Sequence, residues 1–480
     1  MTIPPTWSGD LASIVLDLAE SSAPDWIALE HDDRRVTIRE LSGSIRAIAS
    51  TLSNQGHGAV AICEPDPIRH TVAVLGAIAA GRPALLVDTR QPASVLVDAA
   101  TRVAATCCVG RPVAGVPCLN SEESVRCLDA EPPTQGARPD DPGTIFLTSG
   151  STDRPKLVVR SRSADLHASM CVPLARFPIE PGDRHWMAVP HASAAFLTLV
   201  IGALLQRATV VFGAFVRDGV DRTLNRLGIS SVYLVPTMLR LAREHDGLRG
   251  RGWDGLRALA TGGERLDDET ATCLLDRFGP RVYCAYGMTE CPRVAEATLE
   301  EIAERPGTVG RPIALRHVAI APDDGSEQLG PGAEGQILVR GPDLFSHYHG
   351  GPAAEPWHRT GDRGWIDEDG YVYVAGRDSA VVNVAGNRVS TEQLGDLLRS
   401  HPAVAQAAVI AVRDEIWTNR LRAFAVLKPG SQLRDSELTA WFEQRVARYQ
   451  IPREFIFLDD LPTDGSGKVS LRTLQGLAAR

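Results

Sequence analysis

The chain has no excess of basic residues. Its 50 Lys and Arg are outnumbered by 59 Asp and Glu, and the formal net charge at pH 7 is −9. A general nucleic-acid binder needs a positively charged face, so this composition argues against a nucleic-acid partner. The 480 residues are 44% hydrophobic, which is ample for large cores, and a chain of this length is expected to form more than one domain.

Cysteine pairs with metal-binding spacing are missing. None of the nine cysteines belongs to a Cys-x-x-Cys pair, which argues against a zinc site. Their odd number and scattered positions differ from the framework of a disulfide-bonded secreted domain. We therefore expect reduced thiols in a cytoplasmic protein.

Export and membrane signals are missing too. The first 20 residues carry acids but neither Lys nor Arg, whereas a signal peptide starts with basic residues. The longest strongly apolar stretch, residues 194–205, is shorter than the roughly 20 residues that cross a bilayer. These observations predict a soluble protein without a membrane span. Internal repeats and low-complexity tracts are also missing.

What the sequence does contain is an alternation of strand and helix patterns. Apolar runs at residues 59–63 and 84–88 flank a helical pattern at residues 70–80, which indicates an α/β layer with a mostly parallel sheet. Beyond Arg305 the chain changes to Gly-rich β segments, and a compact α/β tail follows residues 376–379. Further strand patterns lie at residues 144–147, 186–190, 209–212, 231–235, 258–261 and 282–285.

A loop rich in hydroxyl groups follows the strand pattern at residues 144–147. Backbone N–H groups and hydroxyls in such a loop can donate hydrogen bonds to a polyphosphate, while Lys156 supplies a point charge. The second Gly and the Gly-Lys-Ser/Thr ending of a P-loop are missing. A solvated Ser/Thr turn between two elements is the alternative. The loop consists of Thr148, Ser149, Gly150, Ser151, Thr152, Asp153, Arg154, Pro155 and Lys156.

Two more strand patterns end in polar segments. Residues 258–261 lead into Gly262, Gly263 and Glu264. In open α/β sheets, ligands bind outside the carboxyl ends of the strands, so we expect the three polar segments to converge on one ligand. The third segment, after residues 282–285, is Tyr286, Gly287, Met288, Thr289 and Glu290.

Taken together, these segments resemble the adenylate-forming (ANL) superfamily of acyl-CoA synthetases, nonribosomal-peptide adenylation domains and firefly-type luciferases. The resemblance covers nearly the whole chain and is clearest over residues 148–468. Each motif alone is weak, but the ordered set is strong. The set comprises the Thr-Ser-Gly-Ser-Thr loop with its Pro-Lys ending, Gly-Gly-Glu at 262–264, Tyr-Gly-Met-Thr-Glu at 286–290, Thr-Gly-Asp at 360–362, Gly-Arg-Asp at 376–378, Gly-Asn-Arg at 386–388 and Gly-Lys at 467–468.

The resemblance implies an α/β fold in two domains. The large N-terminal adenylation domain, residues 1–377, is expected to contain mixed, mostly parallel sheets with flanking helices plus a β-rich subdomain. A hinge at Asp378 and Ser379 is expected to lead into a small, mobile α+β C-terminal domain, residues 380–480. That domain is expected to swing between two orientations, one for each step of the reaction.

The resemblance also implies an acyl-CoA synthetase, an AMP-forming acid–thiol ligase. A carboxylate attacks the α-phosphate of ATP, which gives an acyl-adenylate and pyrophosphate. A thiol, from CoA or from the phosphopantetheine of a carrier protein, then attacks the acyl carbon and releases AMP. The expected cofactors are ATP, CoA and Mg²⁺, a hard ion that bridges phosphates. A small carboxylic acid is the expected partner, and the chain is expected to be a monomer or a homodimer.

Three residues are expected to carry the chemistry. By resemblance, Glu290 binds Mg²⁺ and Thr289 contacts the α-phosphate; a carboxylate favoured at a helix start is the alternative for Glu290. Lys468, on a Gly-flanked loop, can reach the negative charge that builds up between the carboxylate and the α-phosphate in the transition state. A solvated surface Lys is the alternative for Lys468.

Other residues are expected to hold the nucleotide. Tyr286 is expected to stack on adenine, and Asp362 to accept hydrogen bonds from both ribose hydroxyls. Glycines at 262 and 263 let the backbone approach the base edge, because no Cβ intrudes. The alternatives are a core position for Tyr286, a Gly-flanked turn for Asp362 and a plain strand-to-helix turn for the two glycines. For Arg377 and Arg388 the alternative is a surface salt bridge. The full set is Thr148, Ser149, Gly150, Ser151, Thr152, Lys156, Gly262, Gly263, Glu264, Tyr286, Gly287, Met288, Asp362, Arg377 and Arg388.

Two positions depart from the superfamily pattern. The hydroxyl-rich loop has Asp153 where Gly is usual, and a carboxylate beside a triphosphate is unfavourable unless Arg154 or Lys156 pairs with it. Slow adenylation is therefore expected, and a protein that binds nucleotide or adenylate without catalysing adenylation is one alternative function. The hinge has Ser379 where Asp or Lys is usual.

The acyl pocket is expected at His191, Ala192, Phe196 and Ala285. Superfamily members that activate α-amino acids usually carry Asp just after the aromatic residue that opens the pocket helix, whereas Ala192 follows His191 here. A non-amino carboxylic acid is therefore the expected substrate. His191 is expected to gate the pocket or to orient an aryl acid, with a helix-start His of no substrate role as the alternative. The apolar residues also fit simple core packing.

The acceptor thiol is expected to come from outside the chain. Residues 469–480 are all that follow Lys468, so no fused carrier domain is expected. CoA is the leading acceptor, and a free-standing acyl or aryl carrier protein is the alternative. A luciferase-like oxygenase that acts on an adenylate is the alternative from another class.

Overall fold

A computed structural model describes residues 9–119, 137–148, 155–215, 219–246, 248–263, 266, 268–322, 328–377, 381–414, 417–462 and 471–478. The chain divides into two compact units. The larger contains Met1–Thr89, Val97–Leu147 and Leu157–Gly376. The smaller contains Arg90–Leu96, Thr148–Lys156 and Arg377–Arg480.

One sheet of the larger unit has seven strands, in the order β18-β8-β7-β4-β3-β5-β6. The pairs from β7 to β6 are parallel, whereas β18 runs antiparallel to β8. Parallel strands are buried on both faces, which explains their continuous apolar runs. The strands are β3 (Val60–Cys63), β4 (Ala84–Leu86), β5 (Cys107–Gly110), β6 (Cys118–Leu119), β7 (Pro142–Thr148), β8 (Lys156–Ser161) and β18 (His347–Tyr348).

The other sheet has thirteen strands, in the order β16-β17-β19-β20-β15-β14-β13-β12-β11-β9-β10-β1-β2. Its pairs from β13 to β1 are parallel, whereas the pairs β1–β2, β13–β14, β14–β15, β15–β20, β16–β17 and β17–β19 are antiparallel. The strands are β1 (Ile27–His31), β2 (Arg34–Thr37), β9 (Arg184–Met187), β10 (Thr209–Phe212), β11 (Ser231–Tyr233), β12 (Ala258–Gly262), β13 (Val282–Met288), β14 (Cys291–Thr298), β15 (Thr308–Pro312), β16 (His317–Ala321), β17 (Gly335–Arg340), β19 (His358–Ile366) and β20 (Val372–Arg377).

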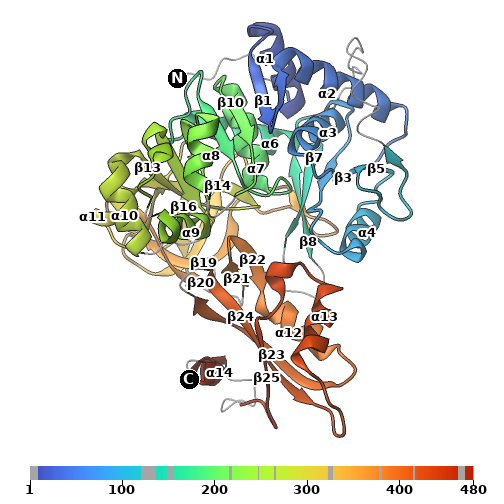
Figure 1. Ribbon diagram of the computed structural model, residues 1–480, viewed down its shortest axis with the longest axis vertical. Helices are drawn as coiled ribbons and strands as arrows, with labels where there is room; N and C mark the ends of the chain where they lie inside the picture. The colour runs from blue at the N-terminus through green and yellow to red at the C-terminus, as the bar shows by residue number, and fades with distance from the viewer. Residues whose placement is uncertain are drawn as a thin grey trace. The chain divides into compact units, whose positions relative to one another are not determined.

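Several helices of the larger unit begin at side-chain caps that satisfy their first N–H groups. Asp10, Thr37 and Asp66 cap α1, α2 and α3, and Ser193 caps α7. Helices α2 and α3 lie side by side, and α3 packs on β3 (Figure 1). The helices are α1 (Leu11–Ser21), α2 (Ile38–Ser53), α3 (Pro67–Ala79), α4 (Ala93–Arg102), α6 (Arg162–Leu174), α7 (Ala194–Leu205), α8 (Val220–Leu227), α9 (Pro236–Asp246), α10 (Asp268–Phe278) and α11 (Leu299–Glu304), with 3₁₀ turns at Arg251–Gly255 and Gly279–Arg281.

Helix α7 is buried along almost its whole length and joins the main core. Phe196, Val200 and Leu204 are each at most 1% exposed, and they belong to one apolar cluster with residues of α1, α2 and α3 and of β3 and β10. Burial of each such side chain stabilises the fold by about 1.5–3 kcal/mol. The start of α7, where His191 precedes the Ser193 cap, is therefore rigidly placed.

The smaller unit is built on a long hairpin. Strands β23 (Val404–Asp414) and β24 (Thr418–Leu427) pair antiparallel, and β25 (Glu454–Phe457) adds in parallel (Figure 1). Apolar clusters cover both faces of this sheet, and Leu474 of the C-terminal helix belongs to one of them. The remaining elements are β21 (Val381–Val384), β22 (Asn387–Ser390), α12 (Thr391–Arg399), α13 (Asp435–Glu443), α14 (Leu471–Ala478) and a 3₁₀ turn at Arg448–Gln450.

The expected α/β class with mixed, mostly parallel sheets is confirmed. One strand prediction needs correction: β13 continues to Met288, so Tyr286, Gly287 and Met288 lie in a strand and not in a loop after residue 285. The cause is β14, which pairs antiparallel with β13 and carries the ladder onward. Within the described residues, the structure contains no helix long and apolar enough to cross a membrane.

Candidate active site

Tyr286 and Asp362 meet directly. The Tyr286 hydroxyl donates a 2.6 Å hydrogen bond to Asp362 Oδ2. Strands β20, β15 and β14 lie between their strands in the sheet order, so the sheet must curve to bring the two side chains together. Asp362 is 2% exposed and lies inside β19, and its backbone N–H donates to Thr360 Oγ1 at 3.0 Å. The alternative that Asp362 lies in a Gly-flanked turn is therefore wrong, because the residue lies within β19.

Gly262 and Gly263 are required by the geometry of β12. Gly262 pairs in register with Ala285, and a Cβ at residue 262 would lie 2.5 Å from the Ala285 carbonyl oxygen and 3.2 Å from the Tyr233 hydroxyl. Gly263 has φ of 91°, a value that side chains rarely adopt. The end of β12 thus packs backbone against backbone on β13, at the residue just before Tyr286.

Thr289 and Glu290 form the two-residue turn between β13 and β14. Met288 pairs with Cys291 across this turn, with a register shift between Tyr286 and Met288. The alternative that Glu290 starts a helix is therefore wrong. Glu290 is 6% exposed, and its Oε1 accepts a 2.8 Å hydrogen bond from the Tyr348 hydroxyl.

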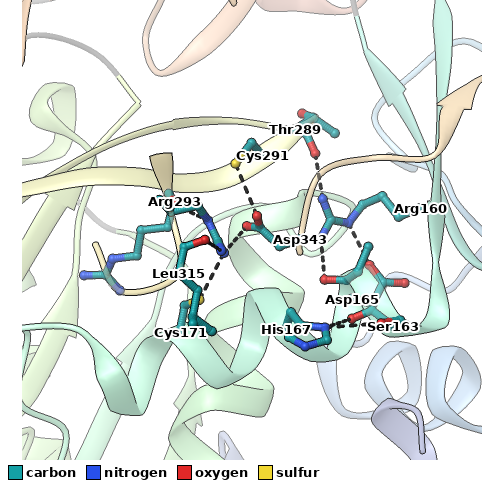
Figure 2. Close-up of polar contacts among 12 residues, drawn as sticks. Arg160, Ser163, Asp165, His167, Cys171, Thr289, Cys291, Arg293, Leu315 and Asp343 are labelled. Carbon is teal, nitrogen blue, oxygen red and sulfur yellow. Dashed lines mark hydrogen bonds and ion pairs between the residues drawn. The ribbon is translucent and has the colours of Figure 1, made fainter. Parts of the chain in front are cut away.

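The buried guanidinium of Arg160 is hydrogen-bonded to the same turn. Arg160 of β8 donates from Nη1 to the Thr289 carbonyl oxygen at 3.3 Å and from Nε to Asp165 Oδ1 at 2.7 Å (Figure 2). Thr144 also donates to both oxygens of Asp165, at 3.0 and 2.8 Å. Burial raises the pKa of Asp165, although the Arg160 charge opposes the shift. The turn therefore rests on an ion pair that is shielded from water.

A second buried pair lies beside the first. Arg316 and Asp343 are 2.5 Å apart with fully buried side chains, and Cys291 Sγ lies 3.4 Å from Asp343 Oδ1 (Figure 2). Arg316 also donates to the Arg293 carbonyl oxygen at 3.2 Å and to Cys171 Sγ at 3.0 Å. Sequence reasoning missed both pairs, because a charged residue beside an apolar run normally indicates a surface position. The one available signal was that Arg160 interrupts an otherwise apolar strand.

The thiols near the turn are poor nucleophiles. Burial, followed by the Glu296 carboxylate, raises the pKa of Cys284 to about 12. Burial, followed by Asp343, raises the pKa of Cys291 well above its ordinary value. Because the thiolate is the attacking form, neither side chain competes at neutral pH with an external thiol for an activated acyl group.

Two of the expected acyl-pocket residues, His191 and Phe196, belong to an aromatic cluster, whereas Ala285 lies in β13 opposite Gly262. The ring centroids of His191 and Phe196 lie 5.8 Å apart, Phe196 stacks on Phe212 at 5.6 Å, and His70 lies 5.0 Å from His191. Ala192 packs against the same core from the start of α7. Burial, followed by His191, lowers the pKa of His70 from 6.5 to about 3, so this ring is neutral at physiological pH. Sequence reasoning did not select His70.

Several expected site residues lie outside the described part of the chain. Thr148 ends β7 and Lys156 begins β8, so the strands that flank the hydroxyl-rich loop are in place. Arg377 ends β20 and Arg388 lies in β22, but nothing is described of their side chains. The expected residues outside the described ranges are Ser149, Gly150, Ser151, Thr152, Asp153, Glu264, Asp378, Ser379 and Lys468.

A resident metal cage is not formed by the described residues. Among them, no group of three or more His, Cys, Asp or Glu side chains is placed to hold a metal ion. Mg²⁺ commonly takes one or two carboxylates and completes its shell with water and substrate phosphates. A single carboxylate such as Glu290, anchored at the turn, fits that mode of binding.

Family comparisons cover most of the chain. The model of the family described as AMP-binding enzyme matches residues 17–349, and the model of the AMP-binding enzyme C-terminal domain matches residues 394–468. A feruloyl-CoA synthase from Amycolatopsis sp is 33% identical over 350 residues, which are 71% of this chain and 71% of that protein.

Two further proteins extend the comparison. A fatty acid–[acyl-carrier-protein] ligase, ScoC, from Streptomyces coeruleorubidus is 30% identical over 367 residues, which are 72% of this chain and 70% of that protein. A solved malonyl-CoA ligase, a ternary product complex with methylmalonyl-CoA and AMP bound, is 28% identical with a TM-score of 0.81. That match covers 94% of this chain and 99% of the solved one.

Proposed function

The chain belongs to the AMP-binding enzyme family, and from this premise we propose that it joins a non-amino carboxylic acid to the thiol of CoA. It is an AMP-forming acid–thiol ligase. The acid oxygen attacks the α-phosphorus of ATP, and pyrophosphate leaves. The thiol sulfur then attacks the acyl carbon, the thiol proton is lost, and AMP leaves.

The observation that carries this proposal is the bond between Tyr286 and Asp362. Adenine and ribose are adjacent in ATP, so a ring for the base and an acceptor for the ribose hydroxyls must also be adjacent. The ring of Tyr286 and the carboxylate of Asp362 meet this requirement, because a 2.6 Å hydrogen bond joins the two side chains. Gly262 and Gly263, at the end of the neighbouring strand, leave open the backbone approach to the base.

Charge at the phosphates is the second requirement. Glu290 would hold Mg²⁺, which would supply positive charge at the phosphates, and Thr289 would contact the α-phosphate. Both residues sit on a two-residue turn that Arg160 and Tyr348 anchor, so their positions are set before substrate arrives. Such preorganisation is where enzymes of this kind gain most of their rate.

Further residues complete the proposal, several of them outside the described ranges. The hydroxyl-rich loop, Ser149 to Thr152 with Thr148 and Lys156, binds the triphosphate. Lys468 stabilises the charge that forms between acid and α-phosphate, while Arg377 and Arg388 bind ribose or phosphate. We place the domain boundary at residues 378–379, with rotation of residues 380–480 between the two half-reactions.

The acid and its acceptor follow from the pocket and the relatives. Ala192 offers no carboxylate for an α-ammonium group, and the rings of His191 and Phe196 favour an aryl or other apolar acid. CoA is the proposed acceptor, and the cytoplasm the proposed location. Similarity to a ligase named for an acyl-carrier protein supports carrier loading as the second candidate.

A pyrophosphate-release screen tests the proposal. The protein is incubated with ATP, Mg²⁺ and a panel of aryl, acyl and amino acids, with and without CoA. We expect release with at least one non-amino acid and formation of its CoA thioester. Release without a thioester would favour a carrier protein. Failure of every acid would favour a protein that binds adenylates without forming them, a role that Asp153 suggests.

Lys468→Ala separates the two half-reactions. We expect the variant to lose most pyrophosphate release, because the developing charge is no longer neutralised. It should still make thioester from a supplied acyl-adenylate, since in the proposal residues 380–480, which include Lys468, rotate between the two half-reactions. Near-normal pyrophosphate release would refute the role of Lys468.

A further inference from the structure

We infer that Tyr348 is a positioning residue for Glu290: its hydroxyl sets the orientation of the carboxylate that binds the metal ion of the ATP complex. The inference rests on the proposed function, which assigns the metal to Glu290. The Tyr348 hydroxyl donates to Glu290 Oε1 at 2.8 Å. A donor on one carboxylate oxygen restricts rotation about the last bond of the side chain and so fixes the direction of the other oxygen.

Tyr348 is itself held by the strand that leaves the hydroxyl-rich loop. In the β18–β8 pair, Tyr348 lies opposite Val158. Backbone hydrogen bonds of 2.8 Å from Ser346 to Val159 and from His349 to Leu157 extend the ladder on both sides. The hydroxyl therefore keeps a fixed relation to Leu157–Val159 of β8.

The same short segment also holds the backbone of Glu290. The Phe345 N–H donates to the Glu290 carbonyl oxygen at 2.8 Å, and the rings of Phe345 and Tyr348 pack at a centroid distance of 4.7 Å. Main chain and carboxylate of Glu290 are thus both bonded to residues 345–348. Asp343, just upstream, accepts from the thiol of Cys291, the first residue of β14.

Residues 345–348 therefore connect β8 with Glu290, which are far apart in the sequence. Residues 345–348 pair with β8, which follows the proposed triphosphate loop, and they bond Glu290, which we propose as the metal ligand. A carboxylate that is to hold a metal ion of the ATP complex would have to be positioned within about 0.5 Å. A tyrosine that served packing alone would need no bond to the carboxylate.

Metal binding can be measured without turnover. Mn²⁺ replaces Mg²⁺ as a paramagnetic probe, and free Mn²⁺ is titrated by electron paramagnetic resonance with the full chain and a non-hydrolysable ATP analogue. We expect Tyr348→Phe to weaken Mn²⁺ binding about ten-fold and Glu290→Gln to weaken it at least as much. Tyr371→Phe is the matched control, because its hydroxyl donates a 2.9 Å bond to Glu301 outside the site.

The outcomes separate the inference from the proposed function. If Glu290→Gln weakens binding and Tyr348→Phe does not, the positioning role is wrong while the function stands. If Glu290→Gln binds Mn²⁺ like the wild type, the metal assignment fails and the inference falls with it.

A second measurement tests the inference even if Tyr348→Phe is partly unfolded. The Mg²⁺ concentration for half-maximal pyrophosphate release reports only on folded molecules, whereas kcat falls with any loss of fold. We expect Tyr348→Phe to raise this midpoint about ten-fold and to approach the wild-type kcat per folded molecule at saturating Mg²⁺. An unchanged midpoint with a lowered kcat would overturn the positioning role.

Discussion

The Tyr286 hydroxyl donates a hydrogen bond of 2.6 Å to the Asp362 carboxylate across a curved sheet. Their motifs are separated by about seventy residues of sequence and by three strands in the sheet order. Thr360 holds the Asp362 backbone from the other side. The ring that we assign to adenine therefore also orients the carboxylate that we assign to ribose.

Tyr286→Phe tests this coupling. The variant keeps the ring for stacking and removes only the hydroxyl that orients Asp362. A hydrogen bond to a charged group contributes about 1.5–3 kcal/mol, so we expect KM for ATP to rise about ten-fold or more with a smaller change in kcat. Initial-rate kinetics of pyrophosphate release measure both. An unchanged KM would mean that Asp362 needs no help from Tyr286.

Gly287→Ala tests the hairpin that presents Thr289 and Glu290. A Cβ at residue 287 would lie 2.2 Å from the Pro292 carbonyl oxygen, and backbone cannot move aside as a flexible side chain can. We expect a loss of about 1–3 kcal/mol in the free energy of unfolding and a large loss of adenylation. Gly330→Ala is the control, because a Cβ there meets nothing within 4 Å. Urea unfolding compares the two, and equal stabilities would contradict the steric argument.

His70 makes stability depend on pH. Its pKa is about 3 in the fold and about 6.5 when unfolded, so between these values the unfolded chain binds a proton that the folded chain excludes. Stability is therefore complete above pH 6.5 and is lost as the pH falls toward 3, by up to about 1.4 kcal/mol per pH unit.

His70→Phe isolates this contribution. The neutral ring should fit beside Phe196 and remove the proton linkage, so its unfolding free energy should fall less steeply between pH 6.5 and 4. Denaturant titrations at several pH values measure the slope. His185, whose pKa burial lowers to about 4, stays in both proteins and cancels in the comparison. Parallel slopes for wild type and variant would show that His70 does not titrate in this way.

Local patterns predicted the elements that local chemistry determines. The apolar helix over residues 194–205 and the strand that ends at Gly262 both lie where the sequence placed them. Strand β14 was missed because Pro292 and the polar residues Arg293 and Glu296 interrupt its apolar pattern. Arg293 and Glu296 form an ion pair with each other in the interior. A hydropathy pattern treats each residue separately, so it cannot predict that two charged residues are buried together.

The same limit applies to the site. Ordered motifs singled out Tyr286, Glu290 and Asp362, but not the partners that position them. Tyr348 and Arg160 reach the turn through strand pairing and sheet curvature, which are set by contacts between distant parts of the chain. The motif residues can be recognised from the chemistry that the substrate requires. Tyr348 and Arg160 can be found only from the three-dimensional packing.

Arg160 and Asp165 offer a direct test of how much the buried ion pair contributes. Both side chains are at most 3% exposed, and removal of one partner leaves a charge without its counterion in the interior. We expect Arg160→Met and Asp165→Leu each to cost about 3–5 kcal/mol, and the double variant to cost clearly less than their sum. Arg305 and Asp369, 31% and 61% exposed, form the control pair, whose coupling should stay below about 1 kcal/mol.

Urea unfolding of the two double-mutant cycles gives both coupling energies. A buried coupling no larger than the surface one would show that Thr144 alone stabilises Asp165, since Thr144 bonds both of its oxygens. Activity adds a separate expectation. Arg160→Met also frees the Thr289 carbonyl, so it should lower kcat for pyrophosphate release more than Asp165→Leu does per folded molecule. Equal losses per folded molecule would show that the bond from Arg160 to the Thr289 carbonyl does not position the turn that carries Thr289 and Glu290.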